Sequence, residues 1–258
     1  MPTLVPDWEV GPNVGALITL RAGGVSRGAF GLQGGGEGGL NLGARCGDDA
    51  ELVQINRARI RALLPSDPVW LRQVHGIAVQ HCVAPALPGS PEMTADAAVT
   101  DVPGVVLAVL TADCLPVLLA DAQRAVVGIA HAGWRGLAGG VIEQTIAGML
   151  QRGARTESIA AYLGPAIGPG AFEVGEDVVA AFDDGASAAA DCFRAAAVPG
   201  KWYADLYALA RLRLSRAGVE AVRGGINCTH GEPAQFYSYR RDGDTGRMGS
   251  FIWIRPAR

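Results

Sequence analysis

The sequence has few of the residues that build disulfide frameworks. It contains five cysteines in 258 residues, an odd number, and they are widely spaced with no C-x-x-C pair among them. A disulfide framework is therefore not expected, and reduced thiols are the better assumption.

The sequence also lacks a long apolar run. No stretch approaches the roughly 20 apolar residues that a spanning helix needs, and the start, MPTLVPDWEV, has neither the basic residues nor the apolar segment of a secretory signal. We expect a cytoplasmic protein without a membrane partner.

Lysine is scarce too, because Lys201 is the sole one among 22 basic residues, and the formal net charge is −3. This balance argues against nucleic acid as a partner, which would favour a basic surface. Small molecules are the expected partners, and either a monomer or a homodimer is compatible with the sequence.

The composition that remains is that of a compact protein, with 49% hydrophobic and 18% charged residues. There is no internal repeat, Pro-rich linker or charge block. We therefore predict a single domain over residues 1–258.

The pattern of apolar residues predicts both strands and helices. Residues 16–21 are a predicted strand, the glycine-rich residues 22–43 a loop, and Asp48 or Asp49 the cap of a helix that runs to about Leu64. Short Val- and Leu-rich runs then predict strands over 69–75, 77–83, 96–100, 105–111, 116–121 and 125–131.

The second half mixes the two types of element. Helices are predicted over 137–152, 176–182 and 203–217, and strands over 158–164 and near Val222 and Phe251. This order favours an α+β fold of layered helices and mixed β-sheets, an α/β/β/α-type sandwich, over a simple alternating parallel sheet.

Three residues stand where an apolar strand opens into a turn. His75 in LRQVHG and His131 in AHAGWRG end predicted strands, and Cys114 in TADCLPVLL interrupts an apolar run. A thiolate with two imidazoles suits zinc, and three protein ligands leave a fourth position for water or substrate. Their spacing matches no short metal motif, so a buried cysteine with two hydrogen-bonded histidines is an equally open interpretation at this point.

A series of motifs adds a resemblance to a known family. RAGGVS, NLGARCGDD, NRARI, LRQVHG, TADCLPVLL, AHAGWRGLAGGVI, GPAIGP with FEVG, and FYSYRRDGDTGRM occur in this order. The chain resembles the laccase-domain family of bacterial purine nucleoside phosphorylases, long labelled multicopper polyphenol oxidases. The resemblance implies zinc bound by His75, Cys114 and His131.

The resemblance also implies a chemistry. The family cleaves adenosine, inosine and methylthioadenosine with phosphate to base and sugar 1-phosphate, and it deaminates adenosine. Cys114 would then belong to the catalytic group. A zinc-bound water is a suitable nucleophile for deamination, whereas phosphorolysis needs a phosphate held against the sugar carbon.

Phosphate calls for cations, and an arginine can bind it with two parallel hydrogen bonds. Arg135 in HAGWRG is the first candidate, since it stands before a predicted helix, although it could pair with a carboxylate instead. Arg57 in NRARI and Asn41 in NLG are further candidates for phosphate or ribose that could equally brace a loop.

Two residues beside the ligands complete the candidates. Gln73 lies two positions before His75, on the same face of the predicted strand, where it could contact substrate or a ligand. Asp113 neighbours Cys114 and could orient a metal-bound imidazole or move a proton, or it could stabilise a turn.

Two motifs depart from the family pattern. Arg45 and Cys46 stand where relatives carry His and Val, which leaves details of the substrate loop open. Tyr237 replaces a phenylalanine and should leave its segment's role intact.

The residues also bear on three other functions. A multicopper oxidase needs a blue-copper site and a separate histidine-rich copper cluster, and this chain has only four histidines. A cysteine hydrolase or amidase with Cys114 as nucleophile and His131 as base is the main alternative, and unlike zinc it would not need His75. A peptidoglycan-precursor editing factor also remains open.

Overall fold

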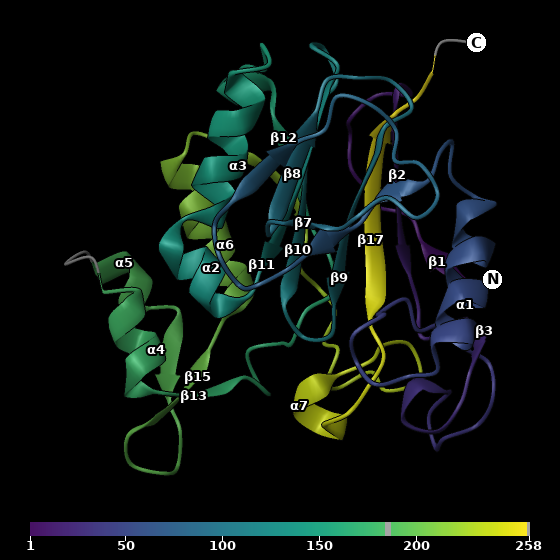
Figure 1. Ribbon diagram of the computed structural model, residues 1–258. Coiled ribbons are helices and arrows are strands. Elements are labelled where there is room, and N and C mark those ends of the chain that lie inside the picture. Colours follow the sequence, from purple (N-terminus) through teal and green to yellow (C-terminus); the bar gives the residue numbers. More distant parts are fainter. Residues whose placement is uncertain (184–186, 257–258) are drawn as a thin grey trace.

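Two mixed β-sheets pack face to face between two outer layers of helices (Figure 1). The structure is a computed structural model that describes residues 1–183 and 187–256. The α+β class and the layered α/β/β/α arrangement expected from the sequence are confirmed. The domain limits of 1–258 stay a prediction.

The first sheet has five strands, which alternate apolar side chains between its two faces. In β17 (Met248–Ile254), for example, Phe251 and Trp253 face the helix α1 (Ala50–Arg61), while Ile252 and Ile254 face the second sheet. In spatial order the strands are β1 (Thr3–Leu4), β2 (Val14–Thr19), β17 (Met248–Ile254), β9 (Val106–Thr111) and β4 (Pro68–Val69).

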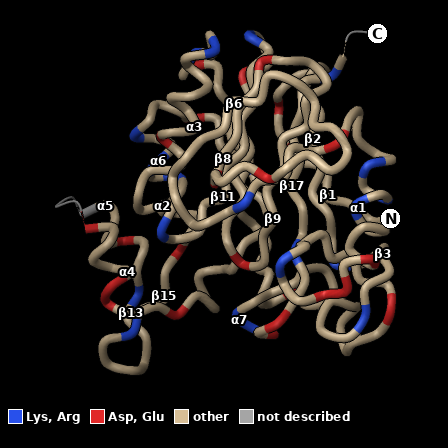
Figure 2. Tube along the Cα trace, viewed as in Figure 1, with Lys and Arg blue, Asp and Glu red and all other residues tan. Residues whose placement is uncertain are grey.

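The second sheet has six strands and lies against the first. Val117 and Leu119 of β10 face helices, whereas Leu118 and Ala120 face the first sheet. In spatial order the strands are β16 (Ala221–Gly224), β12 (Ala160–Leu163), β10 (Leu115–Asp121), β11 (Val126–Ala132), β8 (Ala97–Thr100) and β6 (Val79–His81). Strands β9 and β17 of the first sheet and β8 and β11 of the second contain no Lys, Arg, Asp or Glu, as Figure 2 shows, and β10 contains one such residue, Asp121, at its end.

The helices cover the outer faces of the two sheets. Helix α1 (Ala50–Arg61) packs on the first sheet through Ile60, and the Asp49 side chain accepts a hydrogen bond from the Glu51 amide at its start. Helices α2 (Trp134–Gly139), α3 (Val141–Leu150) and α6 (Leu206–Arg216) cover the second sheet.

Smaller elements lie at the edges. They are β3 (Ala22–Ser26), the 3-10 helices η1 (Gly28–Phe30) and η2 (Thr156–Ser158), the pair β5 (Leu71–Arg72) and β7 (Met93–Thr94), the sheet of β13 (Glu173–Gly175), β15 (Lys201–Ala204) and β14 (Phe193–Ala195), and the short helices α4 (Glu176–Ala181), α5 (Ser187–Ala190) and α7 (Tyr239–Asp242). None of the helices in the described ranges is both long and apolar enough to cross a membrane.

Four local predictions were wrong. The predicted loop 22–43 contains β3, and the predicted helix 137–152 is two helices because Gly140, with a φ of +96°, ends α2 in a left-handed conformation. The predicted helix start near Tyr203 is strand β15. The predicted strand 69–75 breaks up, so that His75 lies in a turn with a φ of +60°.

Candidate metal centre

His75, Cys114 and His131 come together at one end of the second sheet. Cys114 directly precedes β10, and His131 lies in the neighbouring antiparallel strand β11, opposite Pro116. His75 reaches them from the turn after β5. The pairing of β10 with β11 therefore brings together a thiol and an imidazole that are 17 positions apart in the sequence.

The three side chains are close enough to share one ion. Their ligand atoms all lie within 4.8 Å of one another, and the Cys114 Sγ is 3.8 Å from the His75 Nε2. The two imidazole rings meet edge to face, with centroids 4.8 Å apart. Two nitrogen donors and one sulfur donor form a set that suits a transition metal and leaves a further position open.

A buried aspartate, Asp96, holds both histidines in place. Its carboxylate accepts a hydrogen bond from the His131 Nδ1 at 2.9 Å, which leaves the Nε2 of that ring for a metal. The same carboxylate accepts the backbone amides of Val74, His75 and Gly76 at 2.7–3.1 Å. These bonds fix the left-handed turn that presents His75.

Gly133 lets the three ligands approach one another. A Cβ atom at this position would lie 2.9 Å from the His75 Cδ2 and 3.0 Å from the Cys114 Sγ, closer than real Cβ contacts allow. Position 133 therefore requires glycine, because the ligand side chains fill the space that a Cβ atom would need.

Cys114 and His131 shift each other's pKa in opposite directions. Desolvation alone would raise the pKa of the Cys114 thiol, but attraction and hydrogen bonding from His131 and His75 outweigh it and lower that pKa to about 6. Burial likewise opposes protonation of His131, yet Cys114 and Asp96 raise its pKa to about 9. Without a metal, the pair is a thiolate and an imidazolium at neutral pH.

The cluster forms part of the wall of a cavity of about 380 Å³. Around the ligands the wall is cationic and carries one aromatic side chain, the exposed Tyr239. The charged residues that line it are Arg45, Arg57, Arg72, Arg247 and Glu92. An anion could therefore bind next to the ligand cluster.

Two of the residues predicted to bind substrate line this cavity. Arg57 projects from α1, stacks on Trp70 with its Cζ 4.1 Å from the ring centroid, and donates a hydrogen bond to the Leu42 carbonyl. Gln73 pairs its amide with the backbone N–H and C=O of Leu110 at 2.8 Å. Gln73 thus ties the His75 turn to the edge of β9.

Asn41 and Asp113 brace the chain instead. The Asn41 side chain is buried and bonds to Gly43, Asp48 and the Arg247 amide. It does not line the cavity but shapes the loop that carries Arg45.

The Asp113 carboxylate accepts hydrogen bonds from the Thr229 hydroxyl and the Arg240 amide. It therefore joins the cluster to the C-terminal segment, and Asp96 fills the role of imidazole partner that was expected of Asp113. The reason is spatial, because β11 pairs with β8, which begins directly after Asp96.

Arg135 lies outside the lining of the cavity. It is the second residue of α2, its side chain is exposed, and its Cζ lies 4.2 Å from the Trp134 ring centroid.

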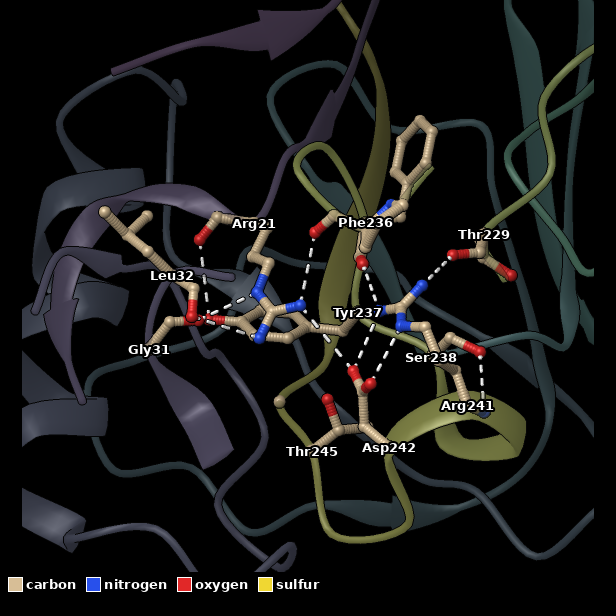
Figure 3. Close-up of polar contacts among 12 residues, drawn as sticks. Arg21, Gly31, Leu32, Thr229, Phe236, Tyr237, Ser238, Arg241, Asp242 and Thr245 are labelled. Carbon is tan, nitrogen blue, oxygen red and sulfur yellow. Dashed lines mark hydrogen bonds and ion pairs between the residues drawn. The ribbon is translucent and has the colours of Figure 1, made fainter. Parts of the chain in front are cut away.

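The FYSYRRDG motif has a structural function, which Figure 3 shows. Arg21 is 5% exposed and donates to the carbonyls of Gly31 and Leu32, while the Tyr237 hydroxyl donates to the Phe30 carbonyl. Arg241 donates in turn to the carbonyls of Thr229, His230 and Phe236, and Asp242 forms ion pairs with both arginines. The network holds the glycine-rich segment against the segment that carries α7.

A family model described as multi-copper polyphenol oxidoreductase laccase matches residues 15–255. The chain belongs to this laccase family. Within residues 1–183 and 187–256, the His75, Cys114 and His131 group is the one set of three such side chains placed to hold an ion. This single cluster does not provide the several copper sites that the family's description would need.

Relatives in the laccase family carry a different name. The chain is 49% identical over 265 residues to a Xylella fastidiosa (strain Temecula1) protein named purine nucleoside phosphorylase, covering 97% of this chain and 96% of the relative. It is 46% identical over 258 residues to the Escherichia coli (strain K12) protein named purine nucleoside phosphorylase YfiH, covering 97% and 98%.

Solved structures agree with the fold. A crystal structure of a Neisseria meningitidis protein superposes with a TM-score of 0.90 at 46% identity, and the match covers 99% of this chain and 100% of that one. The Bacillus licheniformis hypothetical protein YfiH gives a TM-score of 0.84 at 30% identity, covering 94% and 93%.

Asp96, Glu92 and Arg247 are site residues that the sequence analysis did not identify. Asp96 had a local signal, since a lone acid between apolar residues of a predicted buried strand needs a partner. Glu92 and Arg247 stand in polar loops, where charged residues are ordinary. Their place in the site depends on chain segments far apart in the sequence.

Proposed function

We propose that this chain is a zinc-dependent purine nucleoside phosphorylase that cleaves adenosine, inosine or methylthioadenosine with phosphate, releasing the base and a sugar 1-phosphate. The observation that carries the proposal is the ligand cluster of His75, Cys114 and His131 in the wall of an arginine-lined cavity. The names of the relatives support the same reaction.

Zinc fits the donor set. One thiolate and two imidazoles match its preference, and the open position is typical of catalytic rather than structural sites. His131 presents its Nε2 because Asp96 binds the other ring nitrogen. When bound, zinc supplies Lewis acidity, which lowers the pKa of water and stabilises developing negative charge.

We assign the phosphate to the cavity arginines, in particular Arg57 and Arg247, with Arg45 beside them. Phosphorolysis requires a phosphate oxygen to form a bond to the sugar C1′ as the bond from C1′ to the purine N9 breaks. The electron pair of that bond leaves with the base. Arginines held on α1 and the Arg247 loop would bind the dianion and orient it without covalent chemistry.

The expectation for Arg135 is therefore replaced in this proposal. An exposed guanidinium stacked on Trp134 and outside the cavity lining is poorly placed to reach a phosphate beside Cys114. The remaining wall offers Tyr239, whose exposed ring could stack on a purine at the cavity mouth.

The same site supports adenosine deamination as a second activity. There, water adds to the purine carbon that carries the amino group, and ammonia leaves. This reaction needs the ligand cluster but no phosphate, so the two activities should respond differently to loss of the cavity arginines.

A specific observation favours a second candidate, a cysteine hydrolase. The pKa of the Cys114 thiol is lowered and the pKa of His131 is raised, so the imidazole can accept the thiol proton. Asp96 orients the imidazole, and the three groups together resemble a nucleophilic triad. His75 discriminates between the two functions. A hydrolase of this type does not need His75, whereas replacing His75 removes one of the three protein ligands of a zinc site.

The decisive experiment combines metal analysis with product analysis. We expect one zinc per chain, and release of adenine from adenosine that depends on added phosphate. His75→Ala, Cys114→Ala and His131→Ala should each lose zinc and both activities. Full turnover by metal-free protein would disprove the zinc mechanism, and hydrolysis retained in His75→Ala but lost in Cys114→Ala would favour the hydrolase.

A further inference from the structure

The Glu92 carboxylate bridges two arginines of the cavity wall. One of its oxygens lies 2.9 Å from the Arg45 Nη2 and the other 3.6 Å from the Arg57 Nη2. Glu92 is the sole acid among the cavity's lining residues, and its side chain is 19% exposed. A carboxylate thus occupies the position where two arginines would hold an oxyanion.

The bridge also separates two cavities. A larger cavity of about 720 Å³ lies on its other side, between α1 and residues 80–93, and Arg57 and Glu92 line both. The wall of this larger cavity is mainly apolar and includes Trp70, Val83 and Leu87. The Glu92 side chain therefore has space to move into when it leaves the arginines.

The segment that carries Glu92 is weakly tethered. Over residues 83–94 only Ala86 and Glu92 are even half-buried, while the other side chains are exposed. An isolated bridge between Asp67 and Ala86 and the two-residue pairing of β7 with β5 are its sheet contacts in the described structure. A segment with so few buried contacts can move at low cost in free energy.

We propose that Glu92 is an internal counter-ion in the anion subsite of the metal cavity, and that inorganic phosphate binds by displacing it from Arg45 and Arg57. This inference rests on the proposed phosphorylase function, because it takes phosphate to be the anion. Glu92 neutralises the two arginines in the absence of phosphate and positions them for the dianion, whose greater charge competes successfully for both. Glu92 is thus a residue that sets the affinity and selectivity for the anion.

The test is the Glu92→Gln variant, which keeps the shape of the side chain and removes its charge. Phosphate binding is measured by calorimetry on the full chain without nucleoside, and the KM values for phosphate and adenosine are measured separately. We expect about a fivefold gain in phosphate affinity, the size of a partly exposed ion pair, with the adenosine KM unchanged. Glu37→Gln, which breaks the exposed pair of Arg27 and Glu37, is the matched control and should change neither.

A second measurement on the unaltered protein guards against a misfolded variant. If phosphate displaces Glu92, saturating phosphate should speed amide hydrogen exchange over residues 83–94. Slower exchange there, or unchanged or weaker phosphate binding in Glu92→Gln, would show that Glu92 only braces the arginines and would overturn the inference. The proposed function survives those results if phosphorolysis persists, whereas absence of phosphate binding and of phosphorolysis would overturn both.

Discussion

At the scale of single residues, the metal centre depends on Asp96 as much as on its ligands. This buried carboxylate binds the imidazole of His131 and three consecutive backbone amides around His75. One side chain therefore sets the orientation of two ligands from different parts of the chain. Partners of this kind commonly change metal affinity by one to two orders of magnitude.

Asp96→Asn should weaken zinc binding by about 10–100-fold. The amide group of asparagine would point an N–H at backbone donors that now meet a carboxylate oxygen, so the His75 turn should loosen. Zinc affinity is measured by competition with a chelator. Asp101→Asn is the control, because the exposed Asp101 contacts His81 and not the ligand cluster, and equal losses in both variants would contradict the role of Asp96.

Gly133→Ala should also weaken zinc binding, by about tenfold or more, since overpacking of this kind costs about 1–3 kcal/mol. The backbone at Gly133 has φ −62° and ψ 157°, which alanine adopts readily. The expected loss thus comes only from the contact of the new Cβ with His75 and Cys114.

Gly170→Ala provides the matched control for this substitution, because a Cβ there meets nothing within 4 Å. Both variants should stay folded, as judged by circular dichroism. Wild-type zinc affinity in Gly133→Ala would show that the ligands do not approach one another as described.

At the scale of elements, buried polar contacts join segments that the sheets do not pair. Arg21, directly before β3, and Tyr237, two positions before α7, both donate hydrogen bonds to carbonyls of the glycine-rich segment 30–32. These bonds satisfy carbonyl groups that have no strand partner. The motif FYSYRRDG therefore ties the glycine-rich segment 30–32 to the segment that carries α7.

Tyr237→Phe should reduce the free energy of unfolding by about 1–2 kcal/mol, because the Phe30 carbonyl loses its buried donor. Turnover per folded molecule should stay unchanged. Denaturant unfolding measures the first quantity and steady-state kinetics the second. Tyr239→Phe, at a residue that is 60% exposed, should change stability by less than about 0.5 kcal/mol, and a comparable loss there would argue against a specific network.

At the scale of the whole molecule, binding of a metal is coupled to protons. Cys114 has a pKa lowered to about 6 and His131 one raised to about 9, so the metal-free site carries an imidazolium between these values. A metal ion must displace that proton to use the Nε2 of His131.

Zinc affinity should accordingly rise with pH by about tenfold per unit between roughly pH 7 and 9, and level off above the pKa of His131. Below about pH 6 the thiol of Cys114 also becomes protonated, and the affinity should fall more steeply. Calorimetry at pH 7.5 in two buffers with different ionisation enthalpies measures the proton release. The absence of release at that pH would mean that His131 is neutral in the metal-free protein.

The sequence predicted secondary-structure elements well where local chemistry decides them. Short Val- and Leu-rich runs located β9, β10 and β11, and the choice of Asp48 or Asp49 as cap located the start of α1 at Asp49. Local patterns failed where a glycine conformation or a tertiary contact decides, as at Gly140 and in the turn at His75. The choice of Asp113 as imidazole partner followed chain proximity to Cys114, whereas the partner, Asp96, is 35 positions from His131.

By itself, the sequence determined the α+β class, the layered arrangement and the resemblance to a family, because strand alternation and helix caps act over a few residues. It also supplied His75, Cys114 and His131 as candidates. The pairing of β10, β11 and β8, together with the Asp96 bonds, decided that these residues meet, and the approach of α1 to residues 83–92 decided which arginines surround them. These contacts join distant segments, and their energies depend on how the whole chain packs. No local sequence pattern can therefore predict them.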